Sequence, residues 1–491
     1  MSRPLKPLPD AAALLELNTI FTANVQTVIS EWAKEHQPHA SNDGASPSSL
    51  PSRKLYEAQR TLLAVTGKLT ELIAEPSLRI LEVGCQYWES RALYIAAERR
   101  IPDLLAEGGP DGVDVQRIGE ETGIEYLKLS RILRCLCSNH IFSEPTPDHF
   151  ANNVISTALV KNEPLRAYIL NFNLDLYAAS EHMPKSLLDP KKGSSYKVDE
   201  TAFQDALNTT KSRWDWLEEK ITPEQIVSQQ NAVGRPAGYP SVPEPRKYIN
   251  GSMKDGSFPR PEHEIFNLSM LGGGKVHGAA HPYDYPWAEL GKATVVDVGG
   301  GVGGFDVQLS HLYPDLTFVI QDRAPVLKIA ESDVWPRENP TALASGRVQF
   351  LQHDFFNANP TKNAQVYWLR SILHDWSDDY CVSILSALRP AMDPHKSRIL
   401  ICDQLMNTTL GYPDVLPSAP QPLPANYGTS VRFSHQRDLC MMGIINGIER
   451  TPAQLAAIVE KAGLRIEKVW EARSQVPIVE VRVKEQRNGA S

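Results

Sequence analysis

The sequence predicts a mainly α/β protein, in which a helical N-terminal half precedes a doubly wound, seven-stranded sheet. From about residue 262 onward, short apolar runs alternate with helical patterns, as in a sheet whose strands are joined by helices. The β-branched run at 294–296 leads into clustered glycines, which is typical of a buried strand that ends in a tight turn. Upstream segments instead carry apolar residues three and four positions apart, the spacing of a helix face.

The chain has 491 residues, too many for one hydrophobic core, and suggests about three units at the usual ~150 residues per domain. Changes in composition along the chain predict four regions. They are an N-terminal helical extension with a linker (1–80), a helical domain that contains a β-hairpin (81–188), a helical insertion or linker (189–261) and an α/β domain (262–491).

The charge balance argues against nucleic acid or an anionic membrane surface as the main partner, because the net charge is −8. Six cysteines are scattered without the spacing of a zinc site or a disulfide framework. No signal sequence is evident, and no apolar run approaches the ~20 residues of a membrane span. These observations predict a cytoplasmic protein with reduced thiols.

The first helical pattern is amphipathic. Its apolar positions are Leu14, Leu17, Phe21, Val25, Val28 and Trp32. The opposite face carries Glu16 and Gln26 rather than a basic stripe, so we expect a self-association surface and not a membrane anchor. A stretch rich in Ser, Pro, Asn and Gly at about 36–51 then predicts a flexible linker.

Helical patterns at 91–100, 114–122 and 125–139 precede a β-hairpin at 141–152. Three helices followed by a hairpin predict a winged helix, a module that often binds DNA. The third helix is rich in leucine and carries few basic residues, in an acidic chain. A DNA-binding regulator is therefore the less favoured interpretation.

The C-terminal half contains seven candidate strands. They are 294–298, 317–321, 348–352, 366–369, 398–402, 465–470 and 476–484. The last two are too close together for a crossover helix, so we expect an antiparallel hairpin to close the sheet.

Residues 297–304 read DVGGGVGG, in which Gly299, Gly301 and Gly304 fit the dinucleotide pattern G-x-G-x-x-G. Asp297 argues for another cofactor, because its carboxylate would repel a pyrophosphate but suits the ammonium group of an amino-acid cofactor. The run resembles motif I of the S-adenosylmethionine (SAM) methyltransferases. A similar run, ILEVGC at 80–85, has no second glycine and is not expected to form such a turn.

Acidic residues follow the next two strands. Asp322 comes about twenty residues after the glycines, where an acid accepts two hydrogen bonds from a ribose diol. Asp354 follows the third strand and is expected to accept the adenine amino group, with Phe355 packing on the ring. The carboxyl ends of such strands line the ligand crevice of an open α/β sheet.

The fourth strand runs into RSILHDWSD at 370–378, which places His374 where a substrate proton could be removed. An imidazole base needs a carboxylate on its other nitrogen to fix the tautomer and support the imidazolium. Asp403, at the end of the fifth strand, and Glu449, just ahead of a helix, fit this role. His277 and His281 lack a third ligand, so no metal site is predicted.

Segments 88–153 and 266–483 resemble the plant and fungal small-molecule O-methyltransferases, above all through HDWSD at 374–378 and ERT at 449–451. The fungal members that methylate aromatic polyketides are the most similar, through PANYG at 424–428 and NGIERT at 446–451. The resemblance implies a winged-helix N-terminal dimerisation domain and a Rossmann-like SAM domain with a mixed sheet of seven strands.

The resemblance also implies roles for individual residues. The cofactor contacts would be Asp297, Gly299, Gly301, Asp322, Asp354, Phe355 and Arg370; the catalytic residues His374, Asp403 and Glu449; and the phenol-pocket residues Met442 and Asn446. Two of these depart from the family pattern, since Arg370 stands where members commonly carry lysine and Asp403 where plant relatives carry the longer Glu.

The implied reaction is methyl transfer from SAM to a hydroxyl, chiefly a phenol of an aromatic polyketide or related fungal secondary metabolite. S-adenosylhomocysteine (SAH) would be the product, and no metal is expected. A homodimer through the N-terminal half is also expected. The alternative is a pericyclase or decarboxylase on the same fold that binds SAM without consuming it, although the complete set of His374, Asp403 and Glu449 argues against it.

Overall fold

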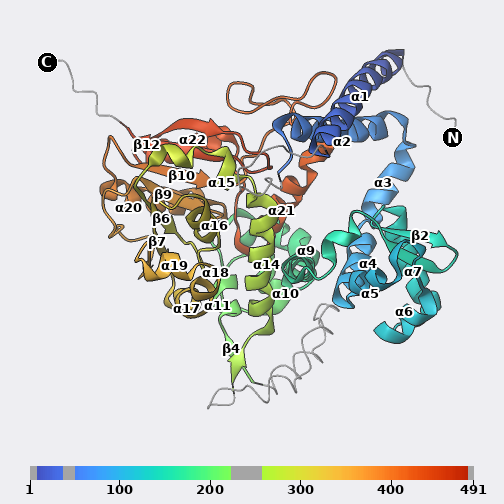
Figure 1. The fold of residues 1–491 in the computed structure, drawn as a ribbon, viewed down its shortest axis with the longest axis horizontal. Helices are drawn as coiled ribbons and strands as arrows, with labels where there is room; N and C mark the ends of the chain where they lie inside the picture. The colour runs from blue at the N-terminus through green and yellow to red at the C-terminus, as the bar shows by residue number, and fades with distance from the viewer. Residues whose placement is uncertain (1–7, 37–49, 223–256, 485–491) are drawn as a thin grey trace. The chain divides into compact units, whose positions relative to one another are not determined.

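The computed structural model describes residues 8–36, 50–222 and 257–484 (Figure 1). These residues form two compact units, each with its own hydrophobic core. The first unit contains the described residues before Glu75 and most of the chain after Val276. The second contains the described part of Glu75–Val276 and the return segment Gly443–Asn446.

A seven-stranded mixed sheet forms the centre of the first unit, as predicted, in the order β11-β12-β10-β9-β6-β7-β8. Its strands are β6 (Ala293–Val298), β7 (Leu316–Asp322), β8 (Val348–Gln352), β9 (Val366–Arg370), β10 (Arg398–Cys402), β11 (Leu464–Trp470) and β12 (Ile478–Val483). Strands β10, β9, β6, β7 and β8 are parallel, whereas β12 is antiparallel to both of its neighbours. The strand order reverses between β6 and β9, and ligands bind at such a switch point.

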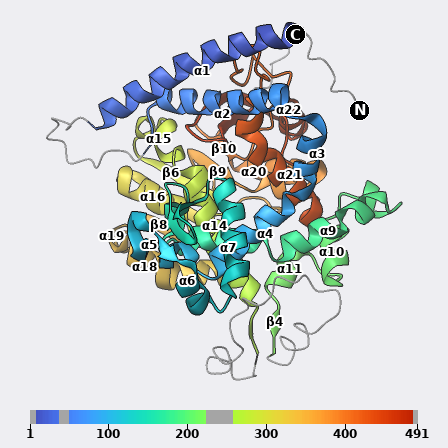
Figure 2. The ribbon, with the colours of Figure 1, turned by 90° about the vertical axis from the view of Figure 1, so that its right-hand side faces the viewer.

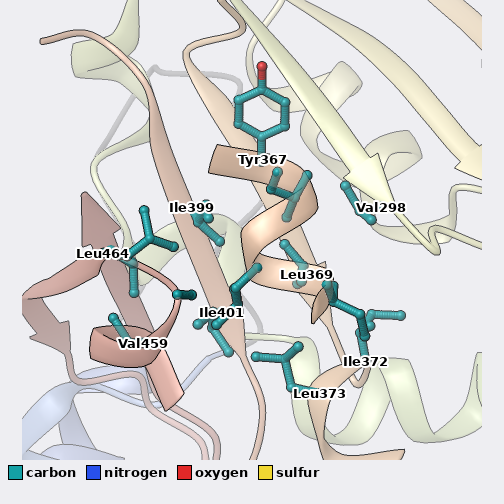
Figure 3. Close-up of a cluster of buried hydrophobic side chains, with 14 of the residues drawn as sticks. Val298, Tyr367, Leu369, Ile372, Leu373, Ile399, Ile401, Val459 and Leu464 are labelled. Atoms are coloured by element: carbon teal, nitrogen blue, oxygen red, sulfur yellow. The ribbon is translucent and has the colours of Figure 1, made fainter. Parts of the chain in front are cut away.

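Both faces of the sheet are buried, which explains why its strands read as continuous apolar runs. Successive residues point to opposite faces, so Val296 and Tyr367 belong to one core and Val295 and Trp368 to the other. Figure 3 shows side chains of the first core, contributed by strands of the sheet, by Ile372 and Leu373 after β9, and by Val459. The helices of this α/β region are α15 (His281–Asp284), α16 (Gly304–Leu312), α17 (Ala324–Ile329), α18 (Trp335–Glu338), α19 (Pro340–Ala344), α20 (Asp378–Leu388), α21 (Arg432–Ile445) and α22 (Pro452–Lys461).

The N-terminal helical extension consists of α1 (Leu8–Glu35) and α2 (Arg53–Ile73), which lie side by side (Figures 1 and 2). Ser52 caps α2 and donates a hydrogen bond to Glu31 of α1. Leu17 of the predicted apolar stripe is buried against Ala64 and Val65 of α2. The stripe is covered only in part, because its members Phe21 and Trp32 stay exposed, together with Leu15 and Ile29 of the same helix.

The second unit contains the helices and hairpin predicted for a winged helix. Helices α6 (Val115–Thr122) and α7 (Tyr126–Ser138) precede β2 (Phe142–Thr146) and β3 (His149–Asn152), and β1 (Val113–Asp114) completes a three-stranded sheet. Arg134 of α7 pairs with Glu144 and Asp148, so part of the basic charge of this helix is neutralised within the module.

The remaining elements of this unit are α3 (Pro76–Cys85), α4 (Tyr87–Glu98), α5 (Ile101–Gly108), α8 (Glu163–Phe172), α9 (Asp175–Leu188), α10 (Ala202–Leu207), α11 (Arg213–Leu217), β4 (Lys220–Ile221), β5 (Phe258–Pro259) and most of α14 (Pro261–Gly278). The ILEVGC run lies in α3, so the prediction that it forms no strand and cofactor turn is confirmed.

The four regions expected from the sequence do not coincide with the two units, because α1 and α2 group with the large sheet and α14 groups mainly with the helical unit. Those limits stay predictions. Most of the expected linker at 36–51 and residues 223–256 of the expected insertion lie outside the described residues. No disulfide joins the six cysteines, all of which are described. In the ranges that the structure describes, no helix has the length and apolarity of a membrane span.

Candidate active site

The glycine-rich turn after β6 brings main chain rather than side chains to the carboxyl end of the sheet. Gly299 has a φ of 75°, and a Cβ atom there would lie 2.5 Å from Cδ1 of Ile372. Gly301 has a φ of 60°, and its N–H donates to Oδ2 of Asp322 at 2.7 Å. The backbone conformation at both positions favours glycine, as the sequence predicts for a cofactor turn.

Asp297 lies near the end of β6 with its side chain 4% exposed. The alternation along β6 turns this side chain to the same face as Val295, toward α16. There its carboxyl group lies close to that of Asp306, a fully buried residue in the first turn of α16, and the two groups act on each other's pKa. Asp306 was not among the residues predicted from the sequence. The available signal was an acid that follows the glycines within an otherwise apolar helix face.

Asp322, predicted to bind a ribose, ends β7 beside the turn. Its carboxylate accepts main-chain N–H groups from Gly301 at 2.7 Å and from Arg323 at 2.6 Å. Burial raises the pKa of Asp322, and these hydrogen bonds oppose the rise. The glycine-rich turn therefore fixes the direction of the Asp322 carboxylate. The contact of this carboxylate with a ribose stays a prediction.

Asp354 follows β8, and its carboxylate accepts hydrogen bonds from the main chain of Phe356 and the side chain of Asn357. These bonds hold the turn that carries Phe355, whose ring packs edge-on against Trp376 at 6.0 Å between centroids. The structure thus places Asp354 and Phe355 after the expected strand. Their contact with an adenine ring stays a prediction.

Arg370 is the last residue of β9. Its guanidinium lies over the ring of Phe305, 5.2 Å from the centroid. Gly278 lies against it, since a Cβ atom there would come within 2.7 Å of Nη1. The charge of Arg370 also acts on Asp297, because it opposes the rise in the pKa of that carboxyl group. Arg370 is thus near the turn, and its contact with a cofactor is an expectation.

His374 lies in a short 3₁₀ turn, η6 (Leu373–Asp375), directly after β9, and is 7% exposed. Its Nδ1 lies 2.9 Å from Oε1 of Glu449, and its Nε2 lies 3.2 Å from Oδ1 of Asp375. Burial alone would lower the pKa of His374, but the two carboxylates raise it to about 9. In this geometry the ring is mainly an imidazolium at neutral pH.

Glu449 is held by two groups that were not predicted from the sequence. Nε of Arg437, on α21, donates to Oε1 of Glu449 at 2.7 Å, and the main-chain N–H of Glu449 donates to Asp438 at 2.9 Å. Burial opposes ionisation, yet the charges of His374 and Arg437 lower the pKa of Glu449 to about 2. Glu449 therefore stays a carboxylate. The available signal was the charged pair Arg437-Asp438 at the start of an apolar run.

Asp403 has a different role from the one expected. It follows β10, and its two oxygens accept the main-chain N–H groups of Ile372 at 3.2 Å and His374 at 3.1 Å. Within the described structure no hydrogen bond joins Asp403 to the imidazole. This corrects the expectation of a second ring partner: the shorter acid binds the backbone that carries His374 and affects the ring only through its charge.

Main-chain contacts join the predicted HDWSD and ERT segments. The N–H of Ile448 donates to the carbonyl oxygen of His374 at 2.8 Å. Arg450, which is 4% exposed, donates to the carbonyl oxygens of Leu373 at 2.9 Å and Trp376 at 2.7 Å. These bonds fix the turn that carries the imidazole relative to the segment that carries its carboxylate partner.

The two residues expected in a phenol pocket differ in their surroundings. Met442 is half-buried on α21, and its role stays a prediction. Asn446 donates from its side-chain nitrogen to the carbonyl oxygens of Lys197 at 2.7 Å and Glu200 at 3.4 Å. Its amide nitrogen therefore binds main chain of the helical unit, and the role of Asn446 in a phenol pocket stays a prediction.

The two histidines considered as metal ligands lie in different environments. The ring of His277 stacks on Phe433 at 5.3 Å. His281 is bonded to the carbonyl oxygen of Val476 and lies 3.4 Å from Sγ of Cys402. Burial lowers the pKa of both imidazoles to about 4. Across the described ranges, no group of three His, Cys, Asp or Glu side chains is arranged to hold a metal ion.

A family profile described as an O-methyltransferase domain matches residues 288–465, which include the glycine turn, His374 and Glu449. Over 480 residues the chain is 55% identical to O-methyltransferase tpcA of Aspergillus fumigatus, and the alignment covers 98% of each chain. The chain belongs to the SAM-dependent O-methyltransferase family.

Solved structures share the fold of this O-methyltransferase. CalO1, a methyltransferase in calicheamicin biosynthesis in its SAH-bound form, has a TM-score of 0.58 at 24% identity, covering 83% of this chain and 98% of that one. A pericyclic reaction enzyme has a TM-score of 0.60 at 19% identity, covering 94% and 99%. At these identities the likeness concerns the fold alone.

Proposed function

We propose that this O-methyltransferase methylates a phenolic hydroxyl of a fungal secondary metabolite such as an aromatic polyketide, with His374 as the general base. The observation that carries the proposal is the 2.9 Å contact between Nδ1 of His374 and the buried carboxylate of Glu449. The 55% identity to O-methyltransferase tpcA supports O-methylation as the reaction class. SAM, when bound, supplies the methyl group on a sulfonium centre.

The residues around the turn fit SAM. The peptide groups of Gly299 and Gly301 lie at the carboxyl end of β6, where a ligand meets main chain. Asp297 offers a buried negative charge for the ammonium group, and Asp322 offers carboxylate oxygens for a ribose diol. A pyrophosphate would instead meet two carboxylates, which disfavours a dinucleotide.

The environment of His374 suits the removal of a proton from a phenol. A phenol with a pKa near ~10 is almost entirely neutral at neutral pH. An imidazole whose pKa is raised to about 9 has a strong affinity for a phenol proton, but only its neutral fraction accepts the proton, so that fraction limits the rate at neutral pH. Glu449 stabilises the imidazolium that forms when Nε2 accepts the proton.

Nε2 of His374 interacts with the carboxylate of Asp375, and the acceptor hydroxyl must replace this interaction. The distance of 3.2 Å between Nε2 and Oδ1 of Asp375 is that of a hydrogen bond. We infer that the acceptor hydroxyl takes the place of this carboxylate on Nε2, while Nδ1 stays bonded to Glu449. Loss of the second carboxylate contact lowers the pKa of His374 and increases the share of neutral base.

A pericyclase that keeps SAM unconsumed is the second candidate, because a pericyclic reaction enzyme shares this fold. A pericyclic rearrangement needs no base on an acceptor hydroxyl. The buried arrangement of His374, Glu449 and Arg437 is therefore better explained by methyl transfer.

We also propose a homodimer formed through α1. Leu15, Phe21, Ile29 and Trp32 are 72%, 41%, 59% and 49% exposed. At ~100° per residue these side chains fall within about one third of the helix circumference. An apolar surface of this kind on a soluble chain is typical of an interface, and a second copy of α1 offers the same surface in return.

Mass spectrometry of reactions that contain SAM and a panel of phenolic metabolites tests the function. Equal amounts of methylated product and SAH are expected, whereas conversion without SAH would support the pericyclase. Calorimetry tests the cofactor separately: SAH should bind and NAD should not. Asp322→Ala should weaken SAH binding by ~1.5–3 kcal/mol through loss of hydrogen bonds to a charged group.

A further inference from the structure

Two buried carboxyl groups face each other beside the glycine turn. Asp297 is 4% exposed and Asp306 is fully buried. Asp297 is paired in the sheet with Trp368 and with Ile320, so it lies in the middle of the parallel strands. Asp306 reaches it from the first turn of α16, and the two carboxyl groups are within hydrogen-bonding distance of each other.

This contact requires a proton. No residue in the described ranges supplies a hydrogen-bond donor to either oxygen of Asp306. Two carboxylates offer only acceptor atoms, so the contact between them is attractive only when one of them is protonated. Burial raises the pKa of Asp306 well above its ordinary value, and the charge of Asp297 raises it further.

The charged groups that face the pair do not replace this proton. Arg370, from β9, lowers the pKa of both acids through its charge, but its guanidinium lies over the ring of Phe305 and donates to neither oxygen of Asp306. Asp322, from β7, acts on Asp297 with a further negative charge. The site therefore holds more acid than local cation, which is the condition for binding one additional positive charge.

We infer that Asp297 and Asp306 share one proton in the cofactor-free enzyme, and that the pair releases it to solvent when the α-ammonium group of SAM or SAH binds at Asp297. The inference rests on the proposed cofactor site. Charge is conserved in the exchange, because the ammonium group supplies the positive charge that the proton supplied before. No covalent bond to carbon or sulfur changes.

The exchange makes cofactor affinity depend on pH in one direction. At low pH the ammonium group must displace a tightly held proton, and at higher pH the pair has already lost it. Affinity for SAH therefore rises with pH, by up to about tenfold per pH unit for one proton. A ligand without an ammonium group, such as 5′-methylthioadenosine, does not compete with the proton.

Isothermal titration calorimetry in buffers of different ionisation enthalpy counts the released protons directly. At about pH 6.5, where a free α-amino group is still protonated, the full-length enzyme should release about one proton on binding SAH. It should release about none on binding 5′-methylthioadenosine. Asp306→Asn removes one of the two carboxyl groups that share the proton, so this variant should release little proton when it binds SAH. Asp315→Asn, on the loop after α16, is the matched control.

Equal proton release by the wild-type enzyme and Asp306→Asn, or equal release with the two ligands, would overturn the inference. If Asp306→Asn does not fold, the wild-type enzyme still tests the inference. The ratio of its affinity for SAH to its affinity for 5′-methylthioadenosine should change with pH between about 5.5 and 7.5. A constant ratio would contradict the shared proton. Absence of SAH binding at every pH would instead contradict the proposed function.

Discussion

Arg437 and His374 donate to the same oxygen of Glu449, at 2.7 and 2.9 Å. Glu449 favours the imidazolium, and the permanent charge of Arg437 disfavours it. Arg437 therefore limits how far Glu449 raises the pKa of His374, while it keeps the carboxylate ionised and fixed in direction. The proposed base, His374 of η6, thus depends on two further residues, Arg437 of α21 and Glu449 of the segment before α22.

Arg437→Gln should raise the pKa of His374, because it removes the opposing charge and keeps the carboxylate. A rise of one unit lowers the share of neutral base, and hence kcat/KM at neutral pH, by about tenfold. The activity should recover as the pH increases. Profiles of kcat/KM against pH measure this, with Arg432→Gln, an exposed residue of the same helix, as the control. An unmoved profile would show that Arg437 has no such influence.

Glu449→Gln should shift the profile in the opposite direction. With its carboxylate partner removed, the pKa of His374 falls from about 9 toward its ordinary value. The rising limb of kcat/KM then moves to lower pH, and the maximal rate falls by ~10- to 100-fold because the weaker base removes a phenol proton less readily. Glu460→Gln, on α22, should leave both unchanged. If the rising limb of the Glu449→Gln profile stays at the same pH, the limb reflects ionisation of the acceptor phenol and not of His374.

Asp403→Asn should act on position more than on proton affinity. The substitution removes the charge and replaces one of the two accepting oxygens with an amide donor, so one main-chain N–H group loses its acceptor, and we expect a loss of ~1.5–3 kcal/mol in the free energy of unfolding. The rate should fall as His374 loses its fixed backbone, with a smaller pH shift than in Glu449→Gln. Effects of the two substitutions should not add, because both act through one imidazole. Rates of the single and double variants measure this, and strictly additive losses would contradict it.

Phe21→Glu combined with Ile29→Glu should convert the proposed homodimer to a monomer, because two charges would be placed in an apolar interface. Light scattering of the full-length chain measures the mass, with Ser30→Glu as a control outside the apolar arc. A wild-type chain that is monomeric at micromolar concentration would rule out the dimer proposal.

The strands and the glycine turn could be predicted from sequence because they depend on local pattern. The run at 294–298 predicts a buried strand, and the observed β6 begins one residue earlier. Gly299 and Gly301 could be predicted because a positive φ and a close backbone approach leave few alternatives to glycine. His374 and Glu449 lie 75 positions apart, and their pairing could be proposed because base chemistry requires a carboxylate.

Other parts of the site depend on the directions of side chains, which no local sequence pattern specifies. Whether Asp403 reaches the imidazole or the backbone depends on one methylene group and on the path of β10 beside β9. The amide of Asn446 is directed by the main chain of Lys197, 249 positions away. Asp306 has ordinary helical neighbours in sequence, and only the register of β6 beneath α16 brings it to Asp297.

The central claim, that His374 removes the proton from the acceptor during methyl transfer, is tested most directly by single-turnover reactions of His374→Ala that follow both product and SAH. The methylation rate should fall by ~10²–10⁴, the usual contribution of a positioned base. Affinity for SAH, measured by calorimetry, should stay nearly constant because the imidazole serves the acceptor. Unchanged methylation in His374→Ala, or conversion of the acceptor without formation of SAH in the wild-type enzyme, would contradict the account.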